Sequence, residues 1–221
     1  MLNKKIISCL VVSLIISGGA TTQVFGANNN INTGYNLNEI NQTTTEAVFL
    51  PINFYYHYDT SYSSFGSNNS GPVAACNILS ALSQLYATDP SMTLTSVLPD
   101  QDYSDLCQRI GYNGSIARPS GQQVSDGLVS FVKSKGYNNI ISNKINGDEI
   151  LGIKNAINNG RPLLLSGTGQ YDREYVVIGY YYNNNQFYAA TCSGIYGDYT
   201  VININIPYDN TLGDVWEVYM N

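Results

Sequence analysis

The sequence predicts an α+β protein, because patterns typical of helices precede a long series of patterns typical of strands. Between residues 71 and 87, apolar side chains recur at helical spacing and fall on one face: Ala74, Ile78, Leu82 and Leu85. From Arg161 onward, apolar and aromatic runs separated by turn residues indicate five strands, at 162–166, 174–182, 186–191, 199–206 and 215–219. No internal repeat or domain boundary is apparent, so we expect one domain over residues 47–221.

The N-terminus has the layout of a Sec signal peptide. Two lysines precede an apolar run from Ile6 to Ile16, and compact residues follow as far as Gly26. This run is shorter than the roughly 20 apolar residues that a membrane-spanning helix needs. We therefore expect residues 1–26 to be removed and the chain to be exported to the extracellular space without a stable membrane anchor. A lipoprotein anchor at Cys9 is the alternative, but Cys9 lies inside the apolar run rather than at its end.

Composition narrows the choice of partners. Charged residues make up 12% of the chain and its net charge is −6, whereas phosphate binding needs clustered Lys and Arg; we expect no nucleic-acid partner. The cysteines after the signal peptide, Cys76, Cys107 and Cys192, lack metal-ligand spacing, so no metal or cofactor is expected. They allow at most one disulfide, and whether one forms stays open. Residues 27–46 are rich in Asn and Thr and are predicted to form a disordered leader.

The remaining elements follow in chain order. Residues 47–58 are predicted to form a strand and residues 59–69 a loop. Ser70 suits the N-cap of a buried central helix, with Pro72 in its first turn. Further expected elements are short helices at 94–98 and 102–110, a helix from Ser120 to about Lys135 ended by Gly136, an extended segment at 137–145, a helix at 148–158 closed by Asn159-Gly160, and a turn at 183–185.

Two blocks of sequence stand out together. The first contains Ser70-Gly71-Pro72 at the start of the central helix. The second contains Gly160-Arg161-Pro162 before an apolar strand, and then Glu174-Tyr175-Val176-Val177-Ile178-Gly179-Tyr180. These blocks resemble the signatures of papain-like cysteine peptidases, above all the branch that processes bacteriocin leader peptides and its secreted bacterial relatives. In that branch Cys-Gly-Pro opens the central helix and a His begins a strand of the form His-x-Val-Val-x-Gly-Tyr.

The resemblance covers roughly Leu50 to Met220 and implies a papain-like fold. It places Ser70 at the nucleophile position and Glu174 at the histidine position. The residue that orients the histidine would be Thr191, with a shift of one residue possible. Asn68 or Asn69 would supply the oxyanion-hole amide. None of the three catalytic positions carries the family's residue.

The substitutions remove the usual chemistry. A serine hydroxyl needs a neighbouring base to become a nucleophile, and a carboxylate does not have the acid–base range of an imidazole. The single histidine of the chain, His57, is the only possible rescue base of that kind. We therefore expect a catalytically degenerate protein, a pseudoenzyme that binds a peptide or protein in the remnant cleft between Ser70 and Glu174. A hydrolase with Ser70 as nucleophile, and an extracellular structural or toxin-like module, are the alternatives.

Each candidate also has a purely structural interpretation. Ser70 is then a helix cap. Glu174 is solvated at a strand edge, paired with Arg173 or Arg161, or hydrogen-bonded to Ser70. Cys76 and Cys107 are then small apolar residues of the core. The ligand and the oligomeric state are left open by the sequence.

Overall fold

The computed structural model describes residues 14–15, 44–50, 69–86, 100–114, 118–169, 172–183, 185–192, 199–203 and 213–221. Most of the predicted signal peptide and leader, the loop at 59–68 and the helix predicted at 94–98 lie outside the described residues. Within those residues the chain forms four helices and an antiparallel sheet, which confirms the predicted α+β class.

Helix α1 (Ser70–Leu85) is the central helix that the sequence predicts. Its first thirteen residues, from Ser70 to Leu82, are all buried. This burial is possible because small residues occupy the positions that a surface helix would fill with charged ones, as at Ala74, Ala75 and Ala81. Pro72 lies in the first turn, where its missing N–H costs no hydrogen bond.

The predicted N-cap of α1 is wrong by one residue. Asn69 occupies the cap position with no side-chain hydrogen bond to the helix, and Ser70 is the first helical residue. The Ser70 hydroxyl is unavailable for capping because it bonds to a side chain from the sheet, as described below.

The other three helices are shorter. Helix α2 (Asp100–Ile110) begins slightly earlier than predicted and packs against α3 (Gly121–Ser134). Ser120 caps α3 as expected, and Ser120 and Gln123 form a reciprocal capping box. Helix α4 (Glu149–Asn158) begins after Asp148, whose side chain accepts a hydrogen bond from the N–H of Leu151.

The strands form one sheet in which every described pair is antiparallel. The spatial order is β1-β2-β5-β4-β8-β3, and β6 and β7 continue the sheet from β5. The bounds of the strands are β1 Leu14–Ile15, β2 Thr44–Phe49, β3 Ile140–Lys144, β4 Leu163–Ser166, β5 Glu174–Asn183, β6 Gln186–Cys192, β7 Tyr199–Asn203 and β8 Val215–Met220.

The sheet differs from the sequence prediction in two further respects. Strand β2 begins at Thr44, so Thr44 to Glu46 belong to the sheet rather than to the predicted leader. These residues pair with the end of β5, which supplies the hydrogen-bond partners that an isolated leader lacks. The division into a helical first half and a sheet second half is also incomplete, because β2 precedes α1 and β3 lies between α3 and α4.

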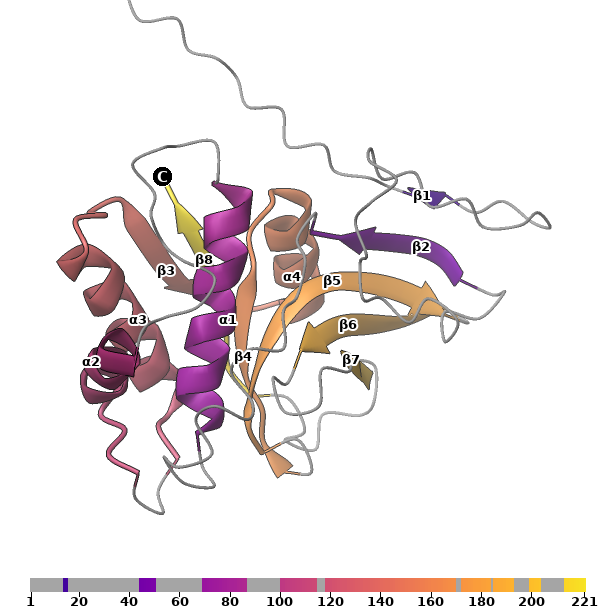
Figure 1. The fold of residues 1–221 in the computed structure, drawn as a ribbon. Coiled ribbons are helices and arrows are strands. Elements are labelled where there is room, and N and C mark those ends of the chain that lie inside the picture. Colours follow the sequence, from indigo (N-terminus) through magenta and orange to yellow (C-terminus); the bar gives the residue numbers. More distant parts are fainter. Residues whose placement is uncertain are drawn as a thin grey trace, which may run out of the picture.

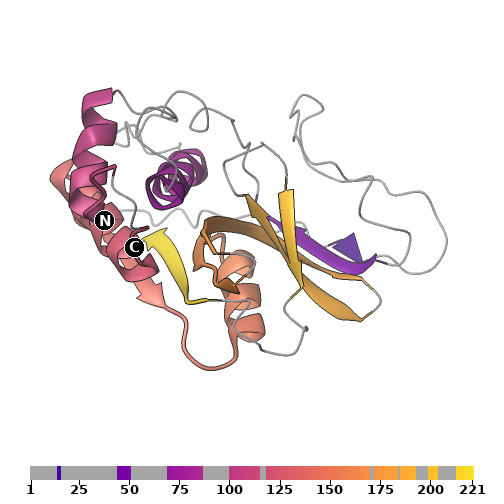
Figure 2. The ribbon, with the colours of Figure 1, turned by 90° about the horizontal axis from the view of Figure 1, so that it is seen from below.

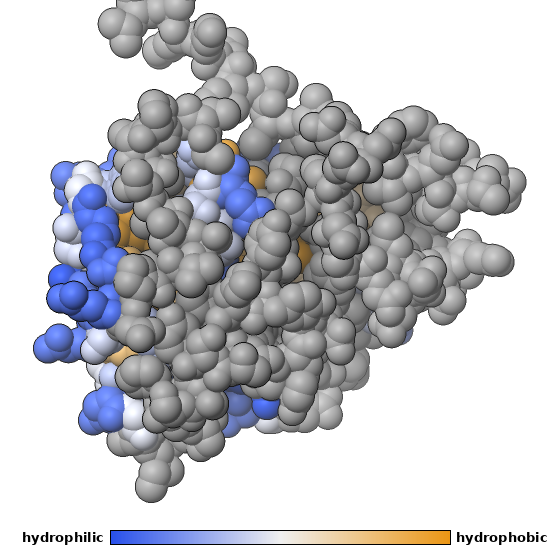
Figure 3. All heavy atoms as spheres, in the orientation of Figure 1, coloured by the Kyte–Doolittle hydropathy of each residue, from blue (hydrophilic) through white to orange (hydrophobic). Residues whose placement is uncertain are grey.

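The elements form three layers. Helices α1, α2 and α3 lie on one face of the sheet and α4 lies on the other (Figures 1 and 2). Strands β3 and β8 are at the end of the molecule beside α2 and α3, whereas β2, β6 and β7 are at the opposite end. Hydrophilic side chains gather over the end formed by α2 and α3 (Figure 3). Among the described residues, no helix is long and apolar enough to cross a membrane.

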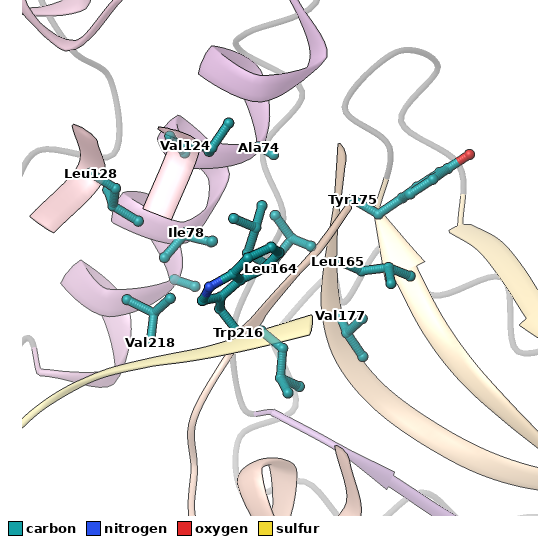
Figure 4. Packing of buried hydrophobic residues seen from close by; sticks show 14 of the residues in the cluster. Ala74, Ile78, Val124, Leu128, Leu164, Leu165, Tyr175, Val177, Trp216 and Val218 are labelled. Carbon is teal, nitrogen blue, oxygen red and sulfur yellow. The ribbon is translucent and has the colours of Figure 1, made fainter. Parts of the chain in front are cut away.

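The hydrophobic core lies between α1, α3 and the sheet. Ile78 of α1 and Leu128 of α3 point toward Leu164 of β4 and toward Trp216 and Val218 of β8 (Figure 4). All five side chains are at most 2% exposed. Helix α1 also packs against β5, and the first residue of each element belongs to one of the two sequence blocks.

Candidate functional site

The structure brings Ser70 and Glu174 into direct contact. Glu174 is the first residue of β5 and Ser70 the first residue of α1. The Ser70 hydroxyl donates to Oε2 of Glu174 at 2.6 Å, and the backbone N–H of Glu174 donates to Oγ of Ser70 at 3.3 Å. This confirms one of the interpretations open at the sequence level, that the two residues hydrogen-bond to each other.

Glu174 is completely buried, with 0% of its surface exposed, so it is not a solvated residue at the edge of a strand. Its second carboxylate oxygen, Oε1, accepts a longer hydrogen bond of 3.4 Å from the Ser166 hydroxyl on β4. Ser166 is directly opposite Glu174 in the strand register, so the two side chains project from the same face of the sheet.

The cationic partner of Glu174 is Arg118, which the sequence analysis missed. Its Nε lies 3.3 Å from Oε1 of Glu174. Its Nη1 forms an ion pair of 2.9 Å with Asp172, and its Nη2 donates to the carbonyl of Gly167 at 3.2 Å. We refer to Ser70, Arg118, Ser166, Asp172 and Glu174 as the Glu174 cluster.

The arginines named in the sequence analysis do not fill this role. Arg161 pairs instead with Glu217 of β8, at 2.9 Å. Arg118 precedes Ser120, the cap of α3, and no local pattern links it to Glu174. The one signal that could have indicated Arg118 is its charge. A buried carboxylate needs a cationic partner, and the described part of the chain contains few arginines.

Burial raises the pKa of Glu174 above its ordinary value of 4.5, while the hydrogen bond from Ser70 and the charge of Arg118 act in the opposite direction. The net effect of these opposing causes is a raised pKa. Ionising this carboxyl group therefore carries a cost that its neighbours offset only in part.

Close packing surrounds the cluster. A Cβ atom at Gly121, the first residue of α3, would lie 2.6 Å from Cβ of Ser166 and overlap the ring of Trp216. A Cβ atom at Gly71 would lie 2.8 Å from Cγ2 of Val124. Glycine at position 71 therefore lets the start of α1 approach α3, and glycine at position 121 lets the start of α3 approach β4 and β8.

Thr191 does not join the pair. It is opposite Val177 in the register between β5 and β6, three residues beyond Glu174. Residues that are directly opposite project from the same face, and side chains alternate along a regular strand. Val177 and Thr191 therefore project from the face opposite to that of Glu174. Thr191 is fully buried there, in the layer on the side of α4.

The remaining sequence candidates are placed only in part. His57 and Asn68 lie outside the described residues. Asn69 is half-buried at the cap of α1. Cys76 and Cys107 are free thiols in the core; burial raises the pKa of both, that of Cys107 to about 11. A thiol with a raised pKa is a poor nucleophile at neutral pH.

The polar groups of the cluster bond mainly to one another rather than facing solvent. Ser70 is only 7% exposed, and both its donor and an acceptor site are used within the cluster. No group of His, Cys, Asp and Glu residues suited to a metal ion occurs in the described ranges. Within the cluster, Asp172, at 70%, and Arg118, at 21%, are the most exposed side chains.

Comparison with known proteins does not assign the chain to a family. No family model matches the chain, and no curated protein matches it significantly. The α+β class and the Glu174 cluster thus stand on the sequence and the geometry alone.

Proposed function

We propose that this chain is a secreted, catalytically inactive protein of papain-like architecture that acts by binding a peptide or protein. The observation that carries this proposal is the hydrogen bond of 2.6 Å between Ser70 and the buried carboxylate of Glu174. These residues occupy the positions that the resemblance assigns to the nucleophile and to the histidine. Their contact supports the papain-like arrangement, and their chemistry speaks against peptidase activity.

The hydrogen bonds of the pair speak against catalysis. A serine nucleophile needs its hydroxyl directed at the substrate and its proton directed at a base. In the described residues the Ser70 hydroxyl is nearly inaccessible, and Arg118 holds Glu174 from its other side. The two side chains are in hydrogen-bond contact, so a ligand does not fit between them. A binding partner would therefore meet the outer side of the cluster, at Arg118 and Asp172.

The test of catalysis is covalent labelling. The purified protein is treated with a fluorophosphonate probe and with a peptide aldehyde, and modification is read by intact mass and peptide mapping. We expect no labelling of Ser70, and no probe-dependent increase in mass in either the wild type or Ser70→Ala. Stoichiometric labelling of Ser70 that is lost in Ser70→Ala would sink the proposal.

One observation favours a second candidate, a serine hydrolase in which Glu174 is the base. A carboxylate with a raised pKa at 2.6 Å from a hydroxyl can accept its proton. The same labelling experiment separates the two candidates. If Ser70 is labelled, Glu174→Gln should abolish the labelling while Asp172→Asn, which leaves Glu174 in place, should not.

The proposed architecture has its own test. Replacing Ser70 by Cys and Glu174 by His restores the pair of residues that the resembled family carries. A helix N-terminus and a neighbouring imidazolium both lower the pKa of a thiol. We expect the double variant to react with iodoacetamide at pH 6 at least about tenfold faster than Ser70→Cys alone. Equal rates, in variants whose circular dichroism matches the wild type, would count against a papain-like site.

Binding at the outer side of the cluster is tested with a displayed library of random peptides. Peptides enriched on the wild-type protein should lose affinity for Asp172→Lys, which reverses the exposed charge. Asn155→Lys is the matched control, because Asn155 is exposed on α4, on the opposite face of the sheet. Equal loss in the two variants, or no enrichment of any sequence, would contradict binding at this place.

A further inference from the structure

Strand β3 is the last strand at its end of the sheet. It pairs with β8 on one side, and none of the described strands pairs with its other side. Figures 1 and 2 place it at the outer edge of the sheet, beside α3. An edge of this kind presents a row of backbone donors and acceptors that another extended chain can use.

The register identifies which backbone groups face outward. Asn221 donates to the carbonyl of Asn139, and Ile145 donates to the carbonyl of Val215. In an antiparallel ladder, hydrogen-bonded pairs alternate with non-bonded pairs. Counting inward from these two bonds, Ile141 and Asn143 bond to β8. The N–H and C=O groups of Ile140, Ser142 and Lys144 therefore point away from β8.

An open groove of about 570 Å³ runs along this edge, between β3 and the outer side of α3. Its floor and walls come from both elements: Ser125, Asp126, Val129, Ser130, Lys133, Ile140, Ile141 and Ser142. The hydroxyls of Ser125 and Ser142 are 2.7 Å apart, which fixes the helix against the strand at one end. The groove thus combines an unpaired strand edge with an apolar centre at Val129.

Charges of opposite sign flank the apolar centre. Helix α3 and strand β3 run antiparallel and are joined by a short turn, so Lys133 is near Ile140 and Asp126 is near Ser142. Both charged side chains are exposed. Asp126 accepts a hydrogen bond from Gln122 through Oδ1 alone, and Lys133 forms no ion pair with any described residue.

We propose that the groove between α3 and β3 binds an extended peptide segment of a partner protein, which adds to the sheet as a strand antiparallel to β3. The segment carries a basic side chain toward Asp126 and, further along, an acidic side chain toward Lys133. An antiparallel orientation matches every described strand pair of the sheet. It also sets the order of the charges, because the added strand runs from the Ser142 end to the Ile140 end.

Helix geometry gives the spacing of the two charges. Asp126 and Lys133 are two turns apart on α3, which corresponds to about 10 Å along the helix. An extended strand covers about 13 Å in four residues, and every second side chain lies on the same face. The recognised pattern is therefore a basic residue, an apolar residue two positions later and an acidic residue two positions after that.

This inference does not rest on the proposed function. The groove shares none of its lining residues with the Glu174 cluster, so labelling of Ser70 would overturn the proposed function and leave the groove proposal intact.

The experiment uses the purified full chain and two fluorescein-labelled peptides of identical composition. The first is Thr-Ser-Lys-Thr-Val-Thr-Glu-Ser-Thr, and the second exchanges its Lys and Glu. Fluorescence anisotropy should give saturable binding of the first peptide, and the charge-exchanged peptide should bind at least about tenfold more weakly. The protein variant Asp126→Lys with Lys133→Asp should reverse this preference. Equal affinity for the two peptides, or no saturation with either, would overturn the proposal.

A second pair of variants tests the strand edge itself. Ser142→Pro removes the outward N–H, whereas Ser142→Ala keeps the N–H and removes only the hydroxyl. We expect Ser142→Pro to weaken peptide binding at least about tenfold, and Ser142→Ala, which loses only the hydroxyl contact with Ser125, to weaken it by less than about threefold. Equal binding by all three proteins would overturn the proposal. Dimerisation of the wild-type protein that Ser142→Pro abolishes would also overturn it, because the edge would then belong to a second copy of this chain.

Discussion

Ser70 and Glu174 are 104 residues apart in sequence, yet the hydroxyl of the first donates to the carboxylate of the second at 2.6 Å. This hydrogen bond joins the first residue of α1 to the first residue of β5. Ser166 of β4 and Arg118, in the segment that leads into α3, also contact the carboxylate of Glu174. One buried carboxylate therefore connects the helical layer to the sheet. We expect its removal to lower the stability of the protein.

Glu174→Ala should lower the free energy of unfolding by about 3–5 kcal/mol, because it removes one of the two carboxylates that pair with the half-buried Arg118 and leaves the buried Ser70 hydroxyl without its acceptor. Glu174→Gln keeps the size of the side chain and an acceptor oxygen, and should cost less, about 1–3 kcal/mol. Urea denaturation followed by the fluorescence of Trp216 measures both. Wild-type stability in Glu174→Ala would mean that the cluster contributes nothing.

The pH dependence of stability follows from the raised pKa of Glu174. The folded state holds the proton of this carboxyl more tightly than the unfolded state does. The resulting stabilisation is fully present below the ordinary pKa of 4.5 and is lost as the pH rises through the folded-state pKa. The free energy of unfolding of the wild type, relative to Glu174→Gln, should therefore fall as the pH rises from about 4.5. A difference that rises with pH would mean that Arg118 and the hydrogen bonds outweigh burial, and a constant difference would mean that the two effects cancel.

Ser120→Ala should destabilise the protein by about 1 kcal/mol, because the Ser120 hydroxyl accepts the hydrogen bond from the N–H of Gln123 at the start of α3. Ser120→Asn, which can still cap the helix, is the matched control and should lose less than half as much. Thermal unfolding by circular dichroism is sufficient to rank the three proteins. Equal loss in both variants would assign the effect to something other than capping.

Gly121→Ala should cost about 1–3 kcal/mol, because the added methyl group overlaps the ring of Trp216 and lies 2.6 Å from Cβ of Ser166. Gln122→Ala, one residue further along α3 and exposed, should change stability by less than about 0.5 kcal/mol. Chemical denaturation of the two variants gives the comparison. If Gly121→Ala is as stable as Gln122→Ala, α3 is free to move away from β8.

The thiols of Cys76 and Cys107 should resist alkylation in the folded protein. Both are buried and both have raised pKa values. N-ethylmaleimide at pH 7 should modify neither residue within an hour, and 6 M urea should expose both at once. Peptide mapping assigns the sites. Rapid modification of Cys107 alone under native conditions would indicate that α2 opens locally.

The sequence by itself determined most of the helices and strands of this protein. Apolar spacing predicted α1, and the Ser120 cap predicted the start of α3. The apolar runs after Arg161 predicted four of the five strands closely. The predicted end of the remaining strand, β7, lies outside the described residues. These features are local, because each depends on residues a few positions apart. The sequence also singled out Ser70 and Glu174, since the resemblance rests on short blocks that contain them.

Only the tertiary structure decided how these residues are used. Ser70 suits a helix cap by its type, yet it is the first helical residue and bonds to Glu174, because the fold places a buried carboxylate beside it. Arg118 becomes the partner of Glu174 although they are separated by two helices and two strands. Thr191 projects from the opposite face of the sheet, because it is paired with Val177, which lies three residues after Glu174 on β5. Burial and long-range pairing depend on which distant segments meet, and local patterns do not contain that information.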